Sequence, residues 1–172
     1  MGAQRRRAQA DGTPRIATIL VDKSETRSRV PDKLADYPDL AVETAELAAG
    51  DYVLSPEVIV ERKTVDALVN SLKFGRLFGQ LARLQLTCSR PVLLIEGALD
   101  TRRSQIKDEA LRGLIGRLVV HDNIHVIQTA NTTETAAMLH RLALHAQGLT
   151  AKASACAAPS PTWHRPKFTR AT

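Results

Sequence analysis

The sequence is poor in aromatic residues and in cysteine. Phenylalanine, tryptophan and tyrosine make up 3% of its 172 residues while 44% are hydrophobic, so the expected core is aliphatic. A chain of this length and apolar content can bury a sizeable core as one compact domain. The two cysteines, Cys88 and Cys156, fall in a helical pattern and in a polar tail. That setting argues against a disulfide framework and a cysteine-ligated zinc site, and it predicts free thiols.

Long hydrophobic runs are absent as well. The sequence has no stretch of about 18 apolar residues, so it predicts no membrane-spanning helix. The cluster Arg5-Arg6-Arg7 is not followed by the apolar region of a secretory signal peptide. We therefore expect an intracellular protein without a membrane partner, in the cytoplasm or nucleoid if the source is prokaryotic.

Acidic residues are scarce at the two ends of the chain. Residues 1–14 carry a net charge of +2 and residues 148–172 carry +4, so residues 15–147 are neutral although the whole chain carries +6. Neither end shows an apolar period, and we predict that both are disordered. Flexible basic ends suit nucleic acid, because each phosphate contact adds affinity without sequence preference. A solubilising role, or a targeting role for the arginine cluster, fits the charge as well.

Residues 15–147 form the predicted folded domain, in which helix and strand patterns alternate. Extended or apolar runs predict strands at residues 15–21, 41–47, 52–54, 58–63, 91–97 and 125–128. Apolar residues three and four apart, with capping signals, predict helices at residues 30–34, 64–87 with a break near Gly75, 111–119, and from Asn131 onward. This alternation predicts an α/β sandwich with a mixed central sheet flanked by helices.

The last predicted helix is apolar around much of its circumference. Ala137, Met138, Leu139, Leu142 and Leu144 cover more than one face. One apolar face would satisfy a monomer, so the surplus predicts either burial on both sides or a subunit interface, of which we favour the interface.

The stretch Gly50–Asp66 places acids and a lysine at a spacing that suits a metal-dependent phosphodiesterase. Strand alternation puts Glu61 and Lys63 on one face, and the turn before this strand would bring Asp51 back toward Glu61. Two carboxylates beside a lysine can hold a Mg²⁺ ion that keeps some water ligands and touches a phosphate oxygen. A surface ion pair between Glu61 and Lys63 on a structural strand is the alternative.

Asp22 ends the first apolar strand. An acid at the end of a central strand is well placed for a ligand site. The alternative is an ordinary turn aspartate, because residues 22–25 are all polar.

Short blocks of sequence from Val21 to Gly97 occur in a fixed order: Val21-Asp22 with Glu25, Arg27-Ser28 and Pro31; Gly50-Asp51-Tyr52; Val60-Glu61-Arg62-Lys63; Ser71-Leu72; Gly75-Arg76-Leu77 with Gln80; and Arg90-Pro91-Val92-Leu93-Leu94-Ile95-Glu96. In order and spacing they resemble the nuclease domain of the XPF family of structure-specific endonucleases, which includes archaeal Hef-type enzymes and belongs to the PD-(D/E)XK superfamily. The resemblance implies a restriction-endonuclease-like three-layer sandwich. It also implies a dimer that cuts one DNA strand near junctions of duplex and single strand, in repair and recombination.

The resemblance implies roles for individual residues. Asp22, Asp51 and Glu61 correspond to the family's metal-binding acids, for Mg²⁺ or Mn²⁺, and Lys63 corresponds to its catalytic lysine. Supporting or DNA-contacting roles are implied for a further set, comprising Glu25, Arg27, Arg62, Asp66, Arg76 and Gln80.

Two positions depart from the family pattern. Ala67 stands where the family has an aspartate, and the acid Asp66 comes one residue early. A shift of one residue turns a helical side chain by about 100°, so Asp66 is better placed to favour the helix N-terminus. Ser24 stands where the family usually has an arginine. Both departures bear on activity or DNA handling, whereas the metal-binding acids are intact.

The mechanistic hypothesis is hydrolysis of a DNA phosphodiester by a metal-activated water. Nearby carboxylates favour a charged Lys63 that holds the water and stabilises the transition state over a neutral general base. No helix-hairpin-helix pattern follows the last predicted helix, so we expect weak, salt-sensitive DNA binding by a homodimer, or by a heterodimer with another nuclease-family subunit. The alternatives are a non-catalytic DNA-binding or scaffolding subunit, and a nuclease of the same superfamily that acts on four-way junctions or foreign DNA.

Overall fold

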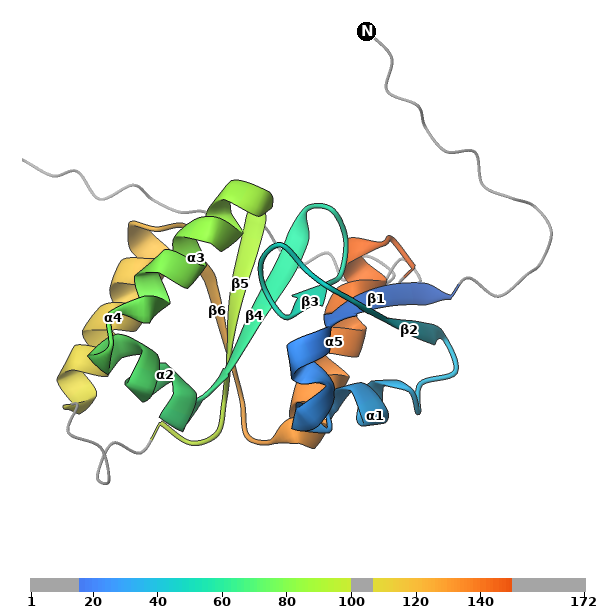
Figure 1. The fold of residues 1–172 in the computed structure, drawn as a ribbon, viewed down its shortest axis with the longest axis horizontal. Coiled ribbons are helices and arrows are strands. Elements are labelled where there is room, and N and C mark those ends of the chain that lie inside the picture. The colour runs from blue at the N-terminus through green and yellow to red at the C-terminus, as the bar shows by residue number, and fades with distance from the viewer. Residues whose placement is uncertain (1–15, 100–106, 150–172) are drawn as a thin grey trace, which may run out of the picture.

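The computed structural model describes residues 16–99 and 107–149, in which six strands form one sheet in the order β2-β1-β3-β4-β5-β6 (Figure 1). The strands are β1 Ala17–Asp22, β2 Leu40–Ala45, β3 Tyr52–Val53, β4 Val58–Thr64, β5 Arg90–Glu96 and β6 His125–Thr129. The helices are the 3-10 helix η1 Lys23–Ser28, then α1 Val30–Leu34, α2 Val65–Lys73, α3 Arg76–Thr87, α4 Asp108–Val120 and α5 Thr132–Ala146. The predicted basic N-terminal segment, nearly all of the predicted C-terminal tail, and Cys156 lie outside the described residues.

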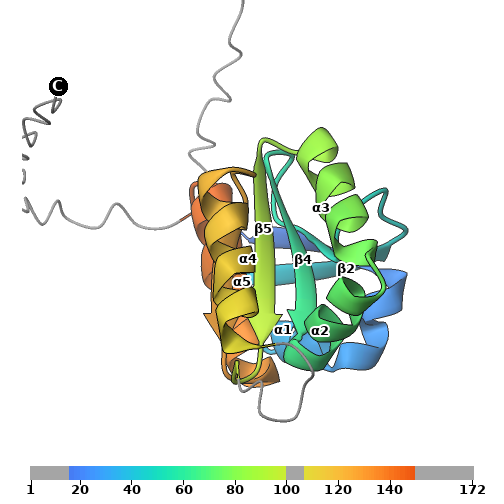
Figure 2. The same cartoon turned by 90° about the vertical axis from the view of Figure 1, so that its left-hand side faces the viewer.

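The sheet is mixed and covered on both faces. β1 and β2 are parallel, β3 is antiparallel to both of its neighbours, and β4, β5 and β6 are parallel. Helices α1 and α5 pack on one face, and α2, α3 and α4 pack on the other (Figure 1). Figure 2 views the molecule from the side of the second group. The predicted three-layer α/β sandwich with a mixed sheet is confirmed.

Strand alternation divides the core between these two faces. On β4, Val58 and Val60 join the cluster under α1 and α5, whereas Ile59 joins the cluster under α2, α3 and α4. Leucine, isoleucine and valine dominate both clusters, and Cys88 is a buried free thiol. The predicted aliphatic core is confirmed, and Tyr52 is the aromatic side chain that it fully buries among the described residues.

The last helix, α5, is buried on two sides. It packs against α1 and against the sheet, and Leu139 and Ala143 are fully buried there. The half-buried Met138 and Leu142 pack against the same cluster. Within residues 16–99 and 107–149, no exposed large hydrophobic residue lies on α5. Burial on both sides therefore accounts for the apolar surplus, and the subunit interface that we favoured is not needed to explain it.

Two glycines set the turns around the candidate site. Gly75 has φ +68 and separates α2 from α3, which confirms the predicted break. Gly50 has φ +74, and a Cβ atom added there would lie 2.5 Å from the Ile59 Cγ2 atom. Only glycine fits the turn that leads into β3, because it combines a left-handed backbone with this close approach.

None of the helices in the described part of the chain is both long and apolar enough to cross a membrane.

Candidate active site

The sheet brings the predicted catalytic residues to neighbouring strand ends. The Asp22 N–H donates to the Asp51 carbonyl oxygen at 2.9 Å, and the Asp51 N–H donates to the Val60 carbonyl oxygen at 2.8 Å. Asp51 therefore lies between the last residue of β1 and the middle of β4. Alternation along β4 directs Glu61 and Lys63 to the face covered by α2, α3 and α4.

Glu61 and Lys63 form a buried ion pair. The Lys63 Nζ atom donates to the Glu61 Oε1 atom at 2.9 Å, and each side chain is 8% exposed. The alternative of a surface ion pair is wrong for this reason. Two charges held out of water on a central strand are costly unless they are well paired, so this position is unusual for residues with a purely structural role.

Asp51 lies beside this pair and has a raised pKa. Its Oδ2 atom accepts the Arg62 N–H at 2.7 Å. Burial, followed by the negative charge of Glu61, raises the pKa of Asp51 from 3.8 to about 7, against the opposing effects of that hydrogen bond and of Lys63. The site therefore holds two carboxylates whose ionised forms repel each other, an arrangement that a cation would relieve.

Asp22 uses both carboxylate oxygens within the chain. Its Oδ1 atom accepts from the Ser24 N–H at 2.9 Å and from the Ser24 hydroxyl at 2.6 Å, and its Oδ2 atom accepts from the Leu47 N–H at 3.0 Å. The Ser24 hydroxyl and these N–H groups lower the pKa of Asp22. The side chain thus caps η1, as the turn-aspartate alternative expects, and its metal-binding role stays a prediction.

The donor chemistry of Asp51 and Glu61 fits a divalent cation. Magnesium is typically held by one or two carboxylates together with water and phosphate oxygens. Among the described residues, the Asp51 Oδ1 and Glu61 Oε2 atoms accept no hydrogen bond from the chain. The same part of the chain gathers no group of three or more His, Cys, Asp or Glu side chains suited to a metal. Asp51 and Glu61 are therefore the two carboxylates that could hold a cation here.

A buried polar network supports β4 from the opposite face. Arg62 donates from Nε and Nη2 to the two carboxylate oxygens of Glu96, at 3.0 and 2.6 Å, and from Nη1 to Glu25 at 3.4 Å. The Tyr52 hydroxyl donates to Glu25 at 2.7 Å, and the Thr135 hydroxyl donates to Glu96 at 2.7 Å. The Arg62 side chain is 8% exposed. Of the roles left open for Glu25 and Arg62, this geometry favours support of the strand over DNA contact.

Sequence reasoning assigned no role to three members of this network, namely Glu96, Tyr52 and Thr135. The sequence did contain one indication of this network. Glu96 is an acid at the end of the otherwise apolar run 91–96. A buried carboxylate needs a partner, and Arg62 on the neighbouring strand supplies it.

Replacing Tyr52 by phenylalanine is expected to lower the free energy of unfolding by about 1–2 kcal/mol, because the buried Glu25 carboxylate loses a charge-assisted hydrogen bond. Urea unfolding followed by circular dichroism measures the change. The matched control is Tyr37→Phe, since the Tyr37 ring stacks on His140 but its hydroxyl forms no hydrogen bond within the described residues. Equal losses in the two variants would contradict a role for the Tyr52 hydroxyl.

The other predicted residues lie on helices beside the site. Asp66 is exposed in the first turn of α2, where an acid favours the helix N-terminus, and Arg27 is exposed in the last turn of η1. Arg76 and Gln80 lie one turn apart at the start of α3, as the sequence predicts. Arg83 continues this row at the next turn, seven residues after Arg76, and the three side chains line one surface hollow. Sequence reasoning missed Arg83, although its spacing of seven residues from Arg76 indicates that the two share one face of the helix.

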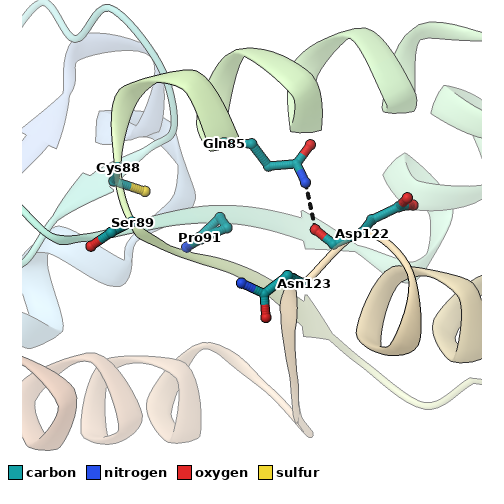
Figure 3. Close-up of a pocket in the computed structure, with 6 residues that line it drawn as sticks. All are labelled: Gln85, Cys88, Ser89, Pro91, Asp122 and Asn123. Carbon is teal, nitrogen blue, oxygen red and sulfur yellow. Dashed lines mark hydrogen bonds between the residues drawn. The ribbon is translucent and has the colours of Figure 1, made fainter.

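A second pocket contains none of these residues. It is lined by Gln85, Cys88, Ser89, Pro91, Asp122 and Asn123, and a hydrogen bond from Gln85 to the Asp122 carbonyl crosses it (Figure 3). It adjoins the first residues of β5, whereas Glu61 and Lys63 lie toward the last residues of the adjacent parallel β4. We assign no role in the candidate site to this pocket.

Comparison with known proteins identifies relatives over most of the described region. The family model of the ERCC4 domain matches residues 21–142. The 3'-flap repair endonuclease Xpf of Saccharolobus solfataricus is 31% identical over 129 residues, which cover 74% of this chain and 55% of that protein. The DNA repair endonuclease XPF of Mus musculus is 44% identical over 80 residues, which cover 46% of this chain and 9% of that protein. The chain thus spans about half of the first relative and a small part of the second.

Solved structures agree with these sequence matches. XPF from Aeropyrum pernix superimposes with a TM-score of 0.71 at 32% identity, over 76% of this chain and 65% of that one. The same protein in complex with DNA superimposes with a TM-score of 0.72 at 31% identity, over 77% of this chain and 66% of that one. The sheet and its two helical layers therefore have the restriction-endonuclease-like fold of that nuclease domain.

Proposed function

Because this chain belongs to the ERCC4-domain family of XPF-type nucleases, we propose that it is a metal-dependent endonuclease that cuts branched or flap DNA in repair or recombination. The observation that carries the proposal is the buried Glu61–Lys63 ion pair beside Asp51, whose pKa is raised to about 7. A scaffold without chemistry has no need of two crowded acids and a buried lysine, and such perturbed groups gather at functional sites.

In the proposed mechanism, Asp51 and Glu61 would hold a Mg²⁺ or Mn²⁺ ion, and Asp22 could be a third ligand only if its capping bonds were released. When bound, the ion supplies a water of lowered pKa and positive charge for the phosphate. Lys63 is oriented by its bond to Glu61 at 2.9 Å. Its ammonium group donates to the attacking water or to a phosphate oxygen and stabilises the charge that develops there.

Residues outside this centre position the substrate. The row Arg76, Gln80 and Arg83 on α3 presents two guanidinium groups and an amide, which suit the phosphates of a DNA backbone. Such contacts orient the DNA but do not read its sequence, which agrees with selection by DNA structure. We propose that the protein acts as a dimer, with itself or with another nuclease-family subunit.

The test is cleavage by purified protein with Mg²⁺ or Mn²⁺. Labelled flap, splayed-arm, four-way-junction and plain duplex DNA are compared in parallel. We expect cutting of the branched substrates over duplex, and we expect Asp51→Ala to lose it. The matched control is Glu43→Ala, which removes an exposed acid of β2 and should leave cutting unchanged. Equal cutting by Asp51→Ala and the unaltered protein would assign the activity to a contaminant.

A second candidate function is a non-catalytic DNA-binding subunit. It is favoured by the capping role of Asp22, which leaves two rather than three acids available, and by Ser24 and Ala67 at the two departures from the family pattern. DNA binding without cleavage, together with no Mg²⁺ binding by calorimetry, would select this candidate over the nuclease.

A further inference from the structure

Two phenylalanine side chains are exposed around the turn between α2 and α3. Phe74 is 68% exposed and Phe78 is 41% exposed. Each ring lies beneath an arginine: the Arg76 Cζ atom is 5.0 Å from the centroid of Phe74, and the Arg117 Cζ atom is 4.8 Å from the centroid of Phe78. We call these four residues the aromatic–arginine surface. Exposed rings are notable in a chain whose aromatic content is 3%.

Three of these four residues lie in a segment with charge of one sign. Residues 67–95 contain four basic residues and no acidic residue, although residues 15–147 as a whole are neutral. Lys73, Arg76 and Arg83 of this segment are exposed. Arg117 of the aromatic–arginine surface lies on α4. Its positive charge is partly offset by Asp122, with which it forms an ion pair at 3.3 Å. Within residues 16–99 and 107–149, the exposed Lys73, Arg76 and Arg83 form no ion pair, and this excess of positive charge favours an anionic partner.

Among anionic partners, the pairing of aromatic rings with cations favours single-stranded nucleic acid. Single-stranded nucleic acid binds where bases stack on aromatic side chains and basic groups contact the backbone, with a contribution from arginine over the rings. The bases of duplex DNA are already stacked and cannot use exposed rings in this way. An apolar protein partner would have to bury several cations without counter-charges, which is costly.

The position of the surface suits a branched substrate. Helix α2 begins two residues after Lys63, and its 9 residues rise by about 14 Å. Phe74 follows its last residue, and α3 then carries the row Arg76, Gln80 and Arg83. Figure 1 shows α2 and α3 in the same outer layer of the molecule. A strand that leaves the candidate active site along α2 would reach the rings within a few nucleotides.

We propose that Phe74 and Phe78 stack with unpaired bases and so hold the single-stranded arm of a branched DNA substrate. Arg76 and Arg117, which already cover the rings, contact the phosphates of that arm. This inference rests on the function proposed above, because it names the part of the substrate that lies outside the duplex.

The test measures DNA binding without cleavage. Anisotropy of a fluorescent oligo(dT) is followed in EDTA for Phe74→Ala, Phe78→Ala and the unaltered protein. Stacking of one base contributes about 1–3 kcal/mol, so each variant should bind about 5- to 150-fold more weakly. Affinity for blunt duplex should change less than about twofold. The matched control is Leu86→Ala on α3, because Leu86 is 89% exposed and has no aromatic ring.

An oligonucleotide of abasic sites serves as the second control, since it keeps the phosphates and lacks the bases. The unaltered protein should bind it about as weakly as the variants bind oligo(dT). Phe74→Leu, which keeps an apolar side chain and the fold, should lose most of the affinity as well. Unchanged oligo(dT) binding by the variants, or equal binding of abasic and normal strands, would overturn the inference.

Two further outcomes are decisive. Loss of a dimer in analytical ultracentrifugation, with oligo(dT) affinity intact, would show that the surface binds a second protein, and the inference would be wrong. Because the assay needs no cleavage, its result is separate from that of the nuclease test. A protein that cuts nothing yet loses base-dependent affinity in Phe74→Ala would contradict the proposed function and support this inference.

Discussion

Lys63→Ala is expected to lower the rate of DNA cleavage by about 100- to 1,000-fold, the usual cost of removing one preorganised donor to a developing charge. The Lys63 Nζ atom is buried and bonded to Glu61 at 2.9 Å, so the ammonium group is held in place before the substrate arrives. The ammonium group then does not have to be repositioned as the transition state forms. Single-turnover cleavage of flap DNA under saturating protein measures the rate, and affinity for the same DNA in EDTA should stay within about threefold.

The matched control is Lys23→Ala, since the Lys23 side chain is 67% exposed and pairs with Glu46 at 3.6 Å. Its cleavage rate should be unchanged. Lys63→Ala also leaves the Glu61 carboxylate buried without its partner, which destabilises the fold. The double variant Glu61→Gln with Lys63→Ala removes both charges, so it should recover stability but not activity. A double variant as active as the unaltered protein would contradict the catalytic role of the pair.

Features that depend on neighbouring residues were predictable from the sequence. The period of two along β4 placed Glu61 and Lys63 on one face, and their short contact confirms it. The glycine at position 75 predicted the break between α2 and α3, and its φ of +68 is the conformation that glycine favours. Asp51 was expected near Glu61 because a tight turn leaves a hairpin few other choices.

Features that depend on distant partners were not predictable in this way. The partners of Arg62 are Glu25 and Glu96, 37 and 34 positions away, and alternation shows only that Arg62 faces away from Lys63. Capping signals show the same limit. Asn131 caps α5, but Glu134, which in a capping box would accept the Asn131 N–H, accepts the Ala130 N–H. A side chain with several nearby donors selects one through packing that the local pattern does not contain.

Asp51→Asn is expected to stabilise the fold at pH 8 while abolishing cleavage. The pKa of Asp51 is about 7 in the folded protein against 3.8 for an unperturbed aspartate, so the folded state binds a proton more tightly than the unfolded state. The resulting destabilisation is absent below about pH 4, grows as the pH rises, and is complete above about pH 7. A difference of about three pKa units corresponds to about 4 kcal/mol. Asparagine carries no charge, and its amide oxygen can still accept the Arg62 N–H.

Urea unfolding at pH 4 and pH 8, with and without Mg²⁺, measures this effect. The Asn variant should gain stability at pH 8 and little at pH 4, and Asp36→Asn, at an exposed aspartate, should gain at neither. Added Mg²⁺ should stabilise the unaltered protein at pH 8 and leave Asp51→Asn unchanged, since a ligand that binds the folded state stabilises it. No gain for the variant at pH 8 would contradict the raised pKa of Asp51. In the proposed mechanism, the charge crowding that destabilises the metal-free fold favours a divalent cation beside these two carboxylates, so stability and cation binding would oppose each other at Asp51.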